Sequence, residues 1–208
     1  MATATKPKNP WPELELATAD GRRQRSDRSR RRIIEALFAL ISEGEMTPSA
    51  ANVAERAGVG LRTVFRHFED MDSIYNEMTQ QLLSAVMPKI KAPFQSSGWR
   101  NQLMESVDRR ADLYEAVFPM RVCMMLRYFQ SEFIREQYDR DLKMERSALK
   151  SILPKRLAQD KTLFAALEVT LSFATWRRLR RDQNLSVAAA KDTMVMMING
   201  LIAGIDDD

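Results

Sequence analysis

Apolar residues recur at three- and four-residue steps along most of the chain, a spacing that predicts amphipathic helices. The first such stretch begins near Asp27 and ends at Gly44. No stretch alternates apolar and polar residues as a half-buried strand does. The sequence therefore predicts an all-α protein. The apolar stripe of the first helix consists of Ile33, Ile34, Leu37, Phe38, Leu40 and Ile41.

Two short helices joined at Gly58 are expected next. The first opens after Thr47-Pro48-Ser49, where either hydroxyl group can cap it, and runs to about Ala57. Gly58 can take the left-handed conformation in which many helices end. The second helix covers roughly residues 61–67.

Prolines and a loop signal divide the rest of the chain into further helices. One begins at Asp70 or Asp72, whose carboxylates suit a helix N-terminus, and runs to Pro88. A loop follows at residues 93–98. The remaining helices are expected over about 99–117, 119–130, 131–153, 160–181 and 186–205.

The stretch from Val53 to Phe68 fits a helix-turn-helix. Ala54 falls where the two short helices cross, which only a small side chain permits, and Gly58 falls four residues later at the turn. The polar residues of the second helix are left to face outward, in the way that this motif presents a helix to the DNA major groove. Val53, Ala57, Val59 and Val64 supply the small core beneath, and Phe68 is expected to be buried as well.

Residues 28–75 resemble the DNA-binding domain of the TetR family of bacterial transcriptional regulators. The resemblance is carried by Val53-Ala54-Glu55-Arg56-Ala57-Gly58-Val59 and by Thr63-Val64-Phe65-Arg66-His67-Phe68. It implies a three-helix domain whose third helix reads DNA, followed by a fourth helix that links it to a ligand-binding, dimer-forming body. By position, the residues assigned to DNA contact are Thr47, Ser49, Arg62, Thr63, Phe65, Arg66 and His67.

The sequence departs from the family pattern at three positions. Phe65 replaces a common Tyr and so lacks a hydroxyl group for a phosphate contact. Met71 stands where a backbone-contacting Lys is frequent, and Gly60 stands where Ser is frequent. The usual phosphate contacts are therefore reduced.

A run of arginines precedes this domain. Residues 22–32 contain seven Arg and one acid, Asp27, a local net charge of +6, whereas residues 33–72 contain three Arg and seven acids. One interpretation is a solvated tail. The other is a basic arm that reaches phosphates or the minor groove, which the adjacent helix-turn-helix favours. The arm residues assigned to DNA contact are Arg22, Arg23, Arg25 and Arg28.

The helical body is rich in methionine: ten of the thirteen Met residues lie from Met78 onward. They either fill irregular gaps in a core or line an adaptable pocket for an apolar or aromatic effector, with Arg121 or Arg127 available for an anionic group. The sequence alone does not choose between them. The residues assigned to the pocket are Met104, Arg121, Met124, Met125, Tyr128, Phe129, Phe173 and Trp176.

The last two expected helices are strongly apolar. Between Val195 and Ile205 only Asn199 is polar, and a helix that is apolar nearly all round must be buried on most sides. The pair resembles the final helices of the family, which form a four-helix bundle with a second subunit. The arginines in residues 176–181 resemble a second nucleic-acid patch, but at a helix end they are more simply interpreted as a solvated face that favours the helix dipole. The residues assigned to the dimer interface are Leu167, Leu171, Val187, Ala190, Met194, Met197 and Leu201.

Several function classes find no support in the sequence. The chain has one cysteine, Cys123, among apolar neighbours, and one histidine, His67, so neither a disulfide framework nor a metal site is expected. No nucleophile motif or Gly-rich phosphate loop is present, which argues against an enzyme, and no cofactor is expected. No apolar run reaches the roughly 20 residues of a membrane span, and the first residues lack the apolar segment of a secretory signal, so a cytoplasmic protein is expected.

Together with these patterns, the resemblance to the TetR family implies a ligand-responsive regulator, a repressor that binds an inverted-repeat operator in double-stranded DNA as a homodimer. Residues 1–26 would form a flexible basic-ended tail, residues 27–72 the helix-turn-helix domain, and residues 73–208 the ligand-binding and dimerisation domain. The net charge of +4 and the pI near 9.3 permit a polyanionic partner. A non-specific architectural DNA-binding protein, and a helical enzyme or ligand-binding protein with a vestigial DNA domain, are the alternatives.

Overall fold

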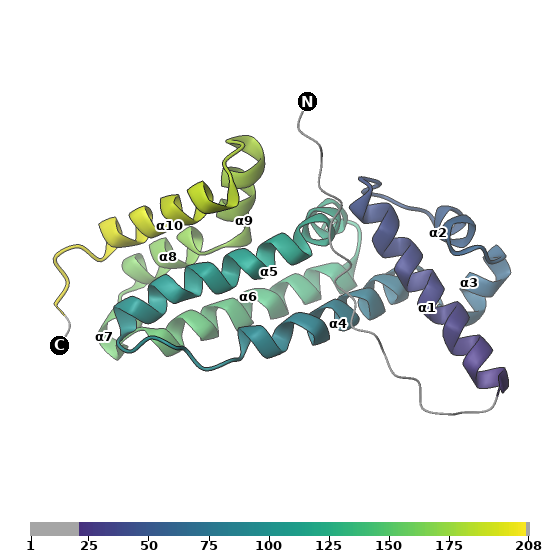
Figure 1. Ribbon diagram of the computed structural model, residues 1–208, viewed down its shortest axis with the longest axis horizontal. Coiled ribbons are helices and arrows are strands. Elements are labelled where there is room, and N and C mark those ends of the chain that lie inside the picture. Colours follow the sequence, from purple (N-terminus) through teal and green to yellow (C-terminus); the bar gives the residue numbers. More distant parts are fainter. Residues whose placement is uncertain (1–20, 207–208) are drawn as a thin grey trace. The chain divides into compact units, whose positions relative to one another are not determined.

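The computed structural model describes residues 21–206, and every regular element in that range is helical (Figure 1). The predicted all-α fold class is confirmed. The elements are α1 (Gly21–Ser42), α2 (Ala50–Ala57), α3 (Leu61–His67), α4 (Met71–Ile90), α5 (Trp99–Arg127), α6 (Glu132–Ile152), α7 (Lys155–Gln159), α8 (Lys161–Thr170), α9 (Phe173–Arg177), the π-helical turn η1 (Arg178–Asp182) and α10 (Val187–Leu201).

The chain forms two compact units. The first contains the described residues up to Pro88 together with Pro119–Ile134, and the second contains Lys89–Phe118 together with the residues from Arg135 onward. Most of α4 and the end of α5 therefore belong to the same unit as the helix-turn-helix. From the sequence, both were expected in the ligand-binding and dimerisation domain, residues 73–208.

Helix α1 begins earlier than the hydrophobic pattern indicated. It starts at Gly21 rather than near Asp27, so residues 21–26, expected in the flexible tail, are helical. Arginine and glutamine favour helices, and neither Gly nor Pro interrupts the chain between Gly21 and Ser42, so the helix extends beyond its apolar stripe. Residues 1–20 of the expected tail lie outside the described residues.

Pro119 does not end a helix as expected. The two segments predicted over 99–117 and 119–130 are one helix, α5. Proline removes one backbone hydrogen bond and clashes with the preceding turn. Residues on both sides of it are buried, however, including Phe118 and Met120, so tertiary packing holds the helix together across Pro119.

The expected helix over 160–181 is divided into α8, α9 and η1. Two side chains from α5 bind the carbonyl oxygen of Leu171 at the end of α8: Tyr114 Oη donates to it at 2.8 Å and Arg110 Nη1 at 3.3 Å. Ser172 then caps α9, because its Oγ accepts from the Thr175 amide at 3.2 Å. The chain thus ends one helix and begins another at Leu171.

The core of the first unit follows the predicted stripe of α1. Ile33, Ile34 and Leu37 are fully buried, and α1 packs against both α2 and α3. Val53, Ala54, Ala57 and Val64 are buried beneath the helix-turn-helix as expected, together with Phe68.

The ends of α2 are capped as the sequence predicted. Of the two hydroxyl groups left open, Ser49 is the cap: its Oγ accepts from the Asn52 amide at 3.2 Å, and the Asn52 side chain accepts from the Ser49 amide at 3.0 Å. At the other end Gly58 is left-handed, with φ +61°, and its amide bonds to the carbonyl groups of Ala54 and Glu55. Short-range signals therefore define this helix.

We expect Gly58→Ala to lower the free energy of unfolding by about 1–2 kcal/mol, because an L side chain is strained in the left-handed conformation. A Cβ atom at Gly58 would also lie 2.7 Å from Arg32 Nη2, which would have to move. Gly60→Ala is the matched control, since Gly60 has φ −72° and a Cβ atom added there would have no neighbour within 4 Å. Urea unfolding followed by circular dichroism measures the free energy of unfolding of both variants. An equal decrease in Gly58→Ala and Gly60→Ala would contradict the prediction.

The second unit encloses a buried tryptophan. Trp176 is fully buried, and its Nε1 donates to Glu115 Oε1 at 2.9 Å. Arg180 shares this carboxylate, through Nε at 2.8 Å and Nη2 at 3.1 Å. Phe173 packs edge-on against Tyr114, with ring centroids 5.5 Å apart. This cluster joins α5 to α9 and η1.

The loop before α5 is held by a carboxylate. Glu105 accepts from the amide of Gln95 and from both the amide and the hydroxyl group of Ser96. Its pKa is lowered to about 2, chiefly by the Ser96 hydroxyl group. Arg109 binds the same carboxylate and donates to the carbonyl oxygens of Ala92 and Pro93, so the loop predicted at 93–98 is fixed to α5.

Candidate nucleic-acid interface

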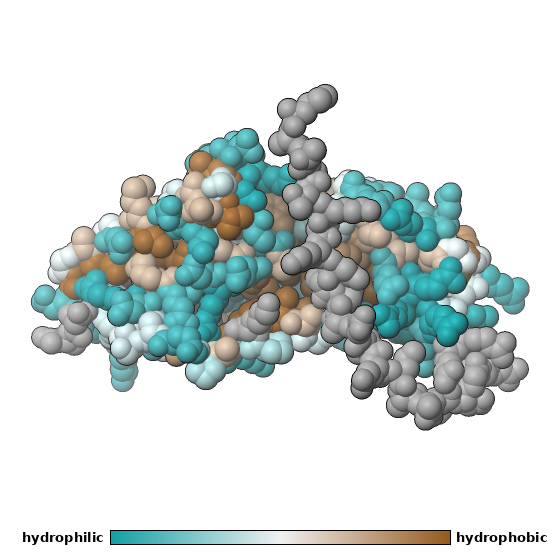
Figure 2. All heavy atoms as spheres, viewed as in Figure 1, coloured by the Kyte–Doolittle hydropathy of each residue, from teal (hydrophilic) through white to brown (hydrophobic). Residues whose placement is uncertain are grey.

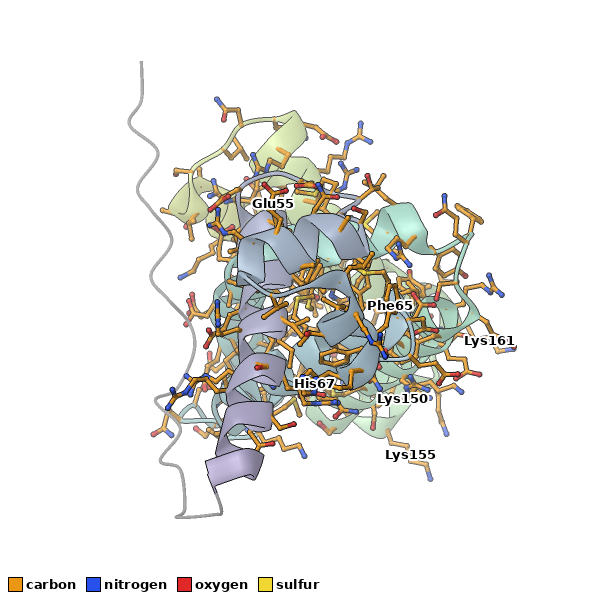
Figure 3. The ribbon with its side chains drawn as sticks, turned by 90° about the vertical axis from the view of Figure 1, so that its right-hand side faces the viewer. Glu55, Phe65, His67, Lys150, Lys155 and Lys161 are labelled. Carbon is orange, nitrogen blue, oxygen red and sulfur yellow. The ribbon has the colours of Figure 1, made fainter. Side chains whose placement is uncertain are left out.

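Helix α3 combines a buried side with an exposed side. Val64 is fully buried and Phe68, which directly follows the helix, is nearly so. Arg62, Phe65 and Arg66 are exposed. Figure 3 looks onto α2 and α3 and labels Phe65 and His67 on α3. The helix therefore presents arginines and an aromatic ring outward, while its aliphatic side holds it on the core.

Two apolar side chains of α3 are unusually exposed. Phe65 is 52% exposed and Leu61 45%. Contiguous exposed apolar patches mark interaction sites more often than scattered apolar residues do. Leu61 and Phe65 lie one turn apart on α3 and therefore form a continuous apolar surface. Beside arginines, an exposed phenyl ring suits contact with a thymine methyl group, whereas the arginines suit guanine edges or phosphates.

His67, at the end of α3, is half-buried. Its pKa is lowered by burial and then by the neighbouring Arg66 and Arg30 cations. Its Nε2 is buried and has no hydrogen-bond partner among the described residues. The imidazole is therefore neutral at pH 7 and adds no charge to this surface.

The other predicted contact residues lie at the start of α2 and on α1. Thr47 and Ser49 are exposed, although the Ser49 hydroxyl group is already used to cap α2. Thr63 is half-buried on α3 and Arg28 is exposed on α1. Arg22, Arg23 and Arg25 belong to α1, but their side chains lie outside the described residues.

Three further arginines of the basic run bind partners within the chain, and these contacts were not predicted from the sequence. Arg31 pairs with Glu35 one turn away, at 2.8 Å. Arg32 Nη2 lies 3.5 Å from the carbonyl oxygen of Gly58. Arg30 binds Glu77, 47 residues along the chain. Only the i,i+4 pair could have been found from the sequence; the other two depend on how α1 crosses the motif.

The start of α4 is tied to the end of α5. Asp72 accepts from Arg127 Nη2 at 2.8 Å and from Ser131 Oγ at 2.6 Å. One turn later Tyr75 Oη lies 3.5 Å from Cys123 Sγ. Burial raises the pKa of both Tyr75 and Cys123, and the Cys123 thiol donates to the carbonyl oxygen of Met46 at 3.0 Å. The interpretation of Cys123 as a buried thiol is confirmed.

The residues assigned to an effector pocket are divided between the two units. In the first unit Met124 is buried, Arg121 and Tyr128 are half-buried, and Met125 and Phe129 are exposed. In the second unit Phe173 and Trp176 are buried in the aromatic cluster and Met104 is half-buried. The pocket remains a prediction.

The residues assigned to a dimer interface are also of two kinds. Leu167, Leu171, Ala190 and Met194 are at most 1% exposed, so they pack inside the subunit and have no surface to offer a partner. Val187 is exposed, and Met197 and Leu201 are half-buried. The sequence did not single out Val169 and Met196, which are 64% and 68% exposed on α8 and α10.

Two further observations concern other function classes. Across residues 21–206 no three His, Cys, Asp or Glu side chains are grouped so that they could hold a metal ion. No helix in the described part of the chain has the length and apolarity needed to cross a bilayer.

The fold has a counterpart among solved structures. The crystal structure of a transcriptional regulator from Rhodococcus sp. Rha1 aligns with a TM-score of 0.67, over 85% of this chain and 97% of that one, at 19% sequence identity. The sequence matches no protein-family model and no curated protein. At this identity the likeness concerns the fold, which the two chains share over nearly all of the regulator's length.

Proposed function

We propose that this protein is a sequence-specific DNA-binding transcriptional regulator of TetR type. The observation that carries the proposal is the exposed side of α3, where Arg62, Phe65 and Arg66 project from a helix held by a buried opposite side. The capped turn at Gly58 and the small Ala54 at the crossing support a helix-turn-helix. The shared fold with a transcriptional regulator is consistent with this function.

We infer that the protein acts as a homodimer through α8 and α10. Hydrophobic side chains gather at the surface along α10 (Figure 2). Val169 and Met196 are largely exposed, and Val187 is 36% exposed, whereas their helices are otherwise anchored in the core. Apolar surface of this kind favours self-association, and a two-fold dimer would present two copies of α3 to an inverted-repeat operator.

The proposal includes an effector that binds in the helical body and causes the protein to release the operator. Without the effector, the protein stays on the operator and represses transcription. Such coupling is reciprocal: a compound that weakens operator binding must itself bind more weakly to the operator complex. The coupling factor is the ratio of operator affinities with and without a candidate compound. The same ratio should be obtained from the affinity of the compound with and without the operator.

Selection from a random duplex library tests the DNA-binding function. We expect enriched sequences with inverted half-sites whose centres are about one helical turn apart or more, and a dimer by light scattering. The selected site should bind at least about 10³-fold more tightly than random DNA. A ratio near one would instead indicate an architectural DNA-binding protein, and a monomer without any enriched site would refute the proposal.

A further inference from the structure

Arg30 joins three helices of the first unit. From α1 its Nε donates to Glu77 Oε2 on α4 at 2.7 Å, and its Nη2 pairs with the same oxygen. Its Nη1 donates to the carbonyl oxygen of His67, the last residue of α3, at 2.6 Å. Its guanidinium carbon lies 4.3 Å from the centre of the Phe68 ring. One side chain thus contacts both the C-terminal end of α3 and the second turn of α4.

Helix α3 needs such a support. It has seven residues, about two turns, and so short a helix is not stable on its own. No side chain caps its N-terminus, where Gly60 stands. At its C-terminus the carbonyl group of His67 carries part of the negative end of the helix dipole, which the Arg30 cation neutralises. The Arg30 contact at the C-terminal end therefore adds to the buried Val64 and Phe68 in fixing the orientation of α3.

The geometry requires arginine at this position. The guanidinium group is planar and rigid, so it can bind a carboxylate and a carbonyl group at the same time while stacking on an aromatic ring. A lysine ammonium could reach Glu77 or His67 but would not reproduce the fork. Because Glu77 compensates its charge, Arg30 offers a phosphate less net charge than the exposed Arg28 does.

We propose that Arg30 is a positioning residue for sequence recognition and that Glu77 holds it in place. It acts through His67 and Phe68, fixing the angle at which α3 presents Arg62, Phe65 and Arg66. This inference rests on the proposed function, because a defined α3 orientation matters for base recognition and little for non-specific attraction to phosphates.

The test compares Arg30→Lys, Glu77→Gln and the control Arg31→Gln in the full-length protein, with the selected operator and random DNA as probes. We expect Arg30→Lys and Glu77→Gln to lower the ratio of specific to non-specific affinity about tenfold, the equivalent of one base contact. Non-specific affinity should not fall. Arg31→Gln removes a cation from the same helix and should leave the ratio unchanged.

Glu77→Gln is the decisive variant, because simple electrostatics predicts the opposite result. Removing an acid makes the protein more basic and should strengthen all DNA binding. Positioning predicts weaker operator binding despite the added charge. In the free protein, amide exchange at Phe68, whose N–H bonds to Val64 at 2.9 Å, should accelerate in both variants and not in Arg31→Gln.

An unchanged or increased specificity ratio in Glu77→Gln and Arg30→Lys, with wild-type amide exchange, would overturn this inference alone. A wild-type protein with no sequence preference would overturn the proposed function and the inference with it. Both substitutions are conservative, and thermal unfolding by circular dichroism verifies that the compared proteins are folded.

Discussion

Replacing Arg22, Arg23, Arg25 and Arg28 by glutamine is expected to weaken DNA binding by roughly 10³-fold near 0.1 M salt. Each phosphate contact contributes about 0.9 to the slope of log affinity against log salt, so losing four should flatten the slope by about 3.6. Because α1 begins at Gly21, a deletion would remove part of a helix, whereas glutamine keeps its helical propensity. Titrations of operator DNA at several salt concentrations measure both quantities.

A matched control separates local contacts from overall charge. Replacing four exposed lysines of the second unit removes the same charge from another part of the chain, and we expect it to change the slope far less. Equal slopes in both variants would show that only net charge matters, and a slope unchanged by the arginine replacements would show that the solvated-tail interpretation was right. The four control lysines are Lys143, Lys150, Lys155 and Lys161.

Trp176→Ala is expected to lower the free energy of unfolding by about 3–5 kcal/mol. The side chain is fully buried, so its removal leaves a cavity in the aromatic cluster of the second unit. The loss of the hydrogen bond to Glu115 contributes less, because Arg180 still binds that carboxylate. Trp176→Phe keeps most of the side-chain volume, so it should lower the free energy of unfolding by well under half as much as Trp176→Ala.

Urea unfolding of these variants, followed by circular dichroism, distinguishes volume from hydrogen bonding. Phe129→Ala is the control, since Phe129 is 86% exposed and its replacement should change stability by no more than about 0.5 kcal/mol. Equal losses for Trp176→Phe and Trp176→Ala would contradict the argument from volume and assign the stability to the Glu115 hydrogen bond.

The helix-turn-helix could be predicted from the sequence because its signals are local. Ser49 and Asn52 cap α2 across three residues, and Gly58 ends it through its own backbone conformation. The break after α8 could not be predicted, because Tyr114 and Arg110 cause it from 57 and 61 residues away. Side chains distant in sequence decide such boundaries, and a local pattern contains no information about them.

The same distinction applies to the candidate site and the dimer surface. The outward side of α3 followed from its apolar spacing, whereas the role of Arg30 depends on Glu77, which the fold brings near. Periodicity identified α10 as apolar nearly all round. It did not show that Met194 faces the subunit's own core while Met196 remains exposed, because that depends on where α10 packs.

The buried thiol of Cys123 can be used to measure how often the first unit opens. It is the one cysteine in the chain, it is fully buried, and its raised pKa keeps it protonated. A thiol in this state reacts with an alkylating reagent only when the surrounding structure opens. The labelling rate of the natural protein, compared with that of a free thiol, therefore gives the equilibrium constant for opening around α4 and α5 without any engineered probe.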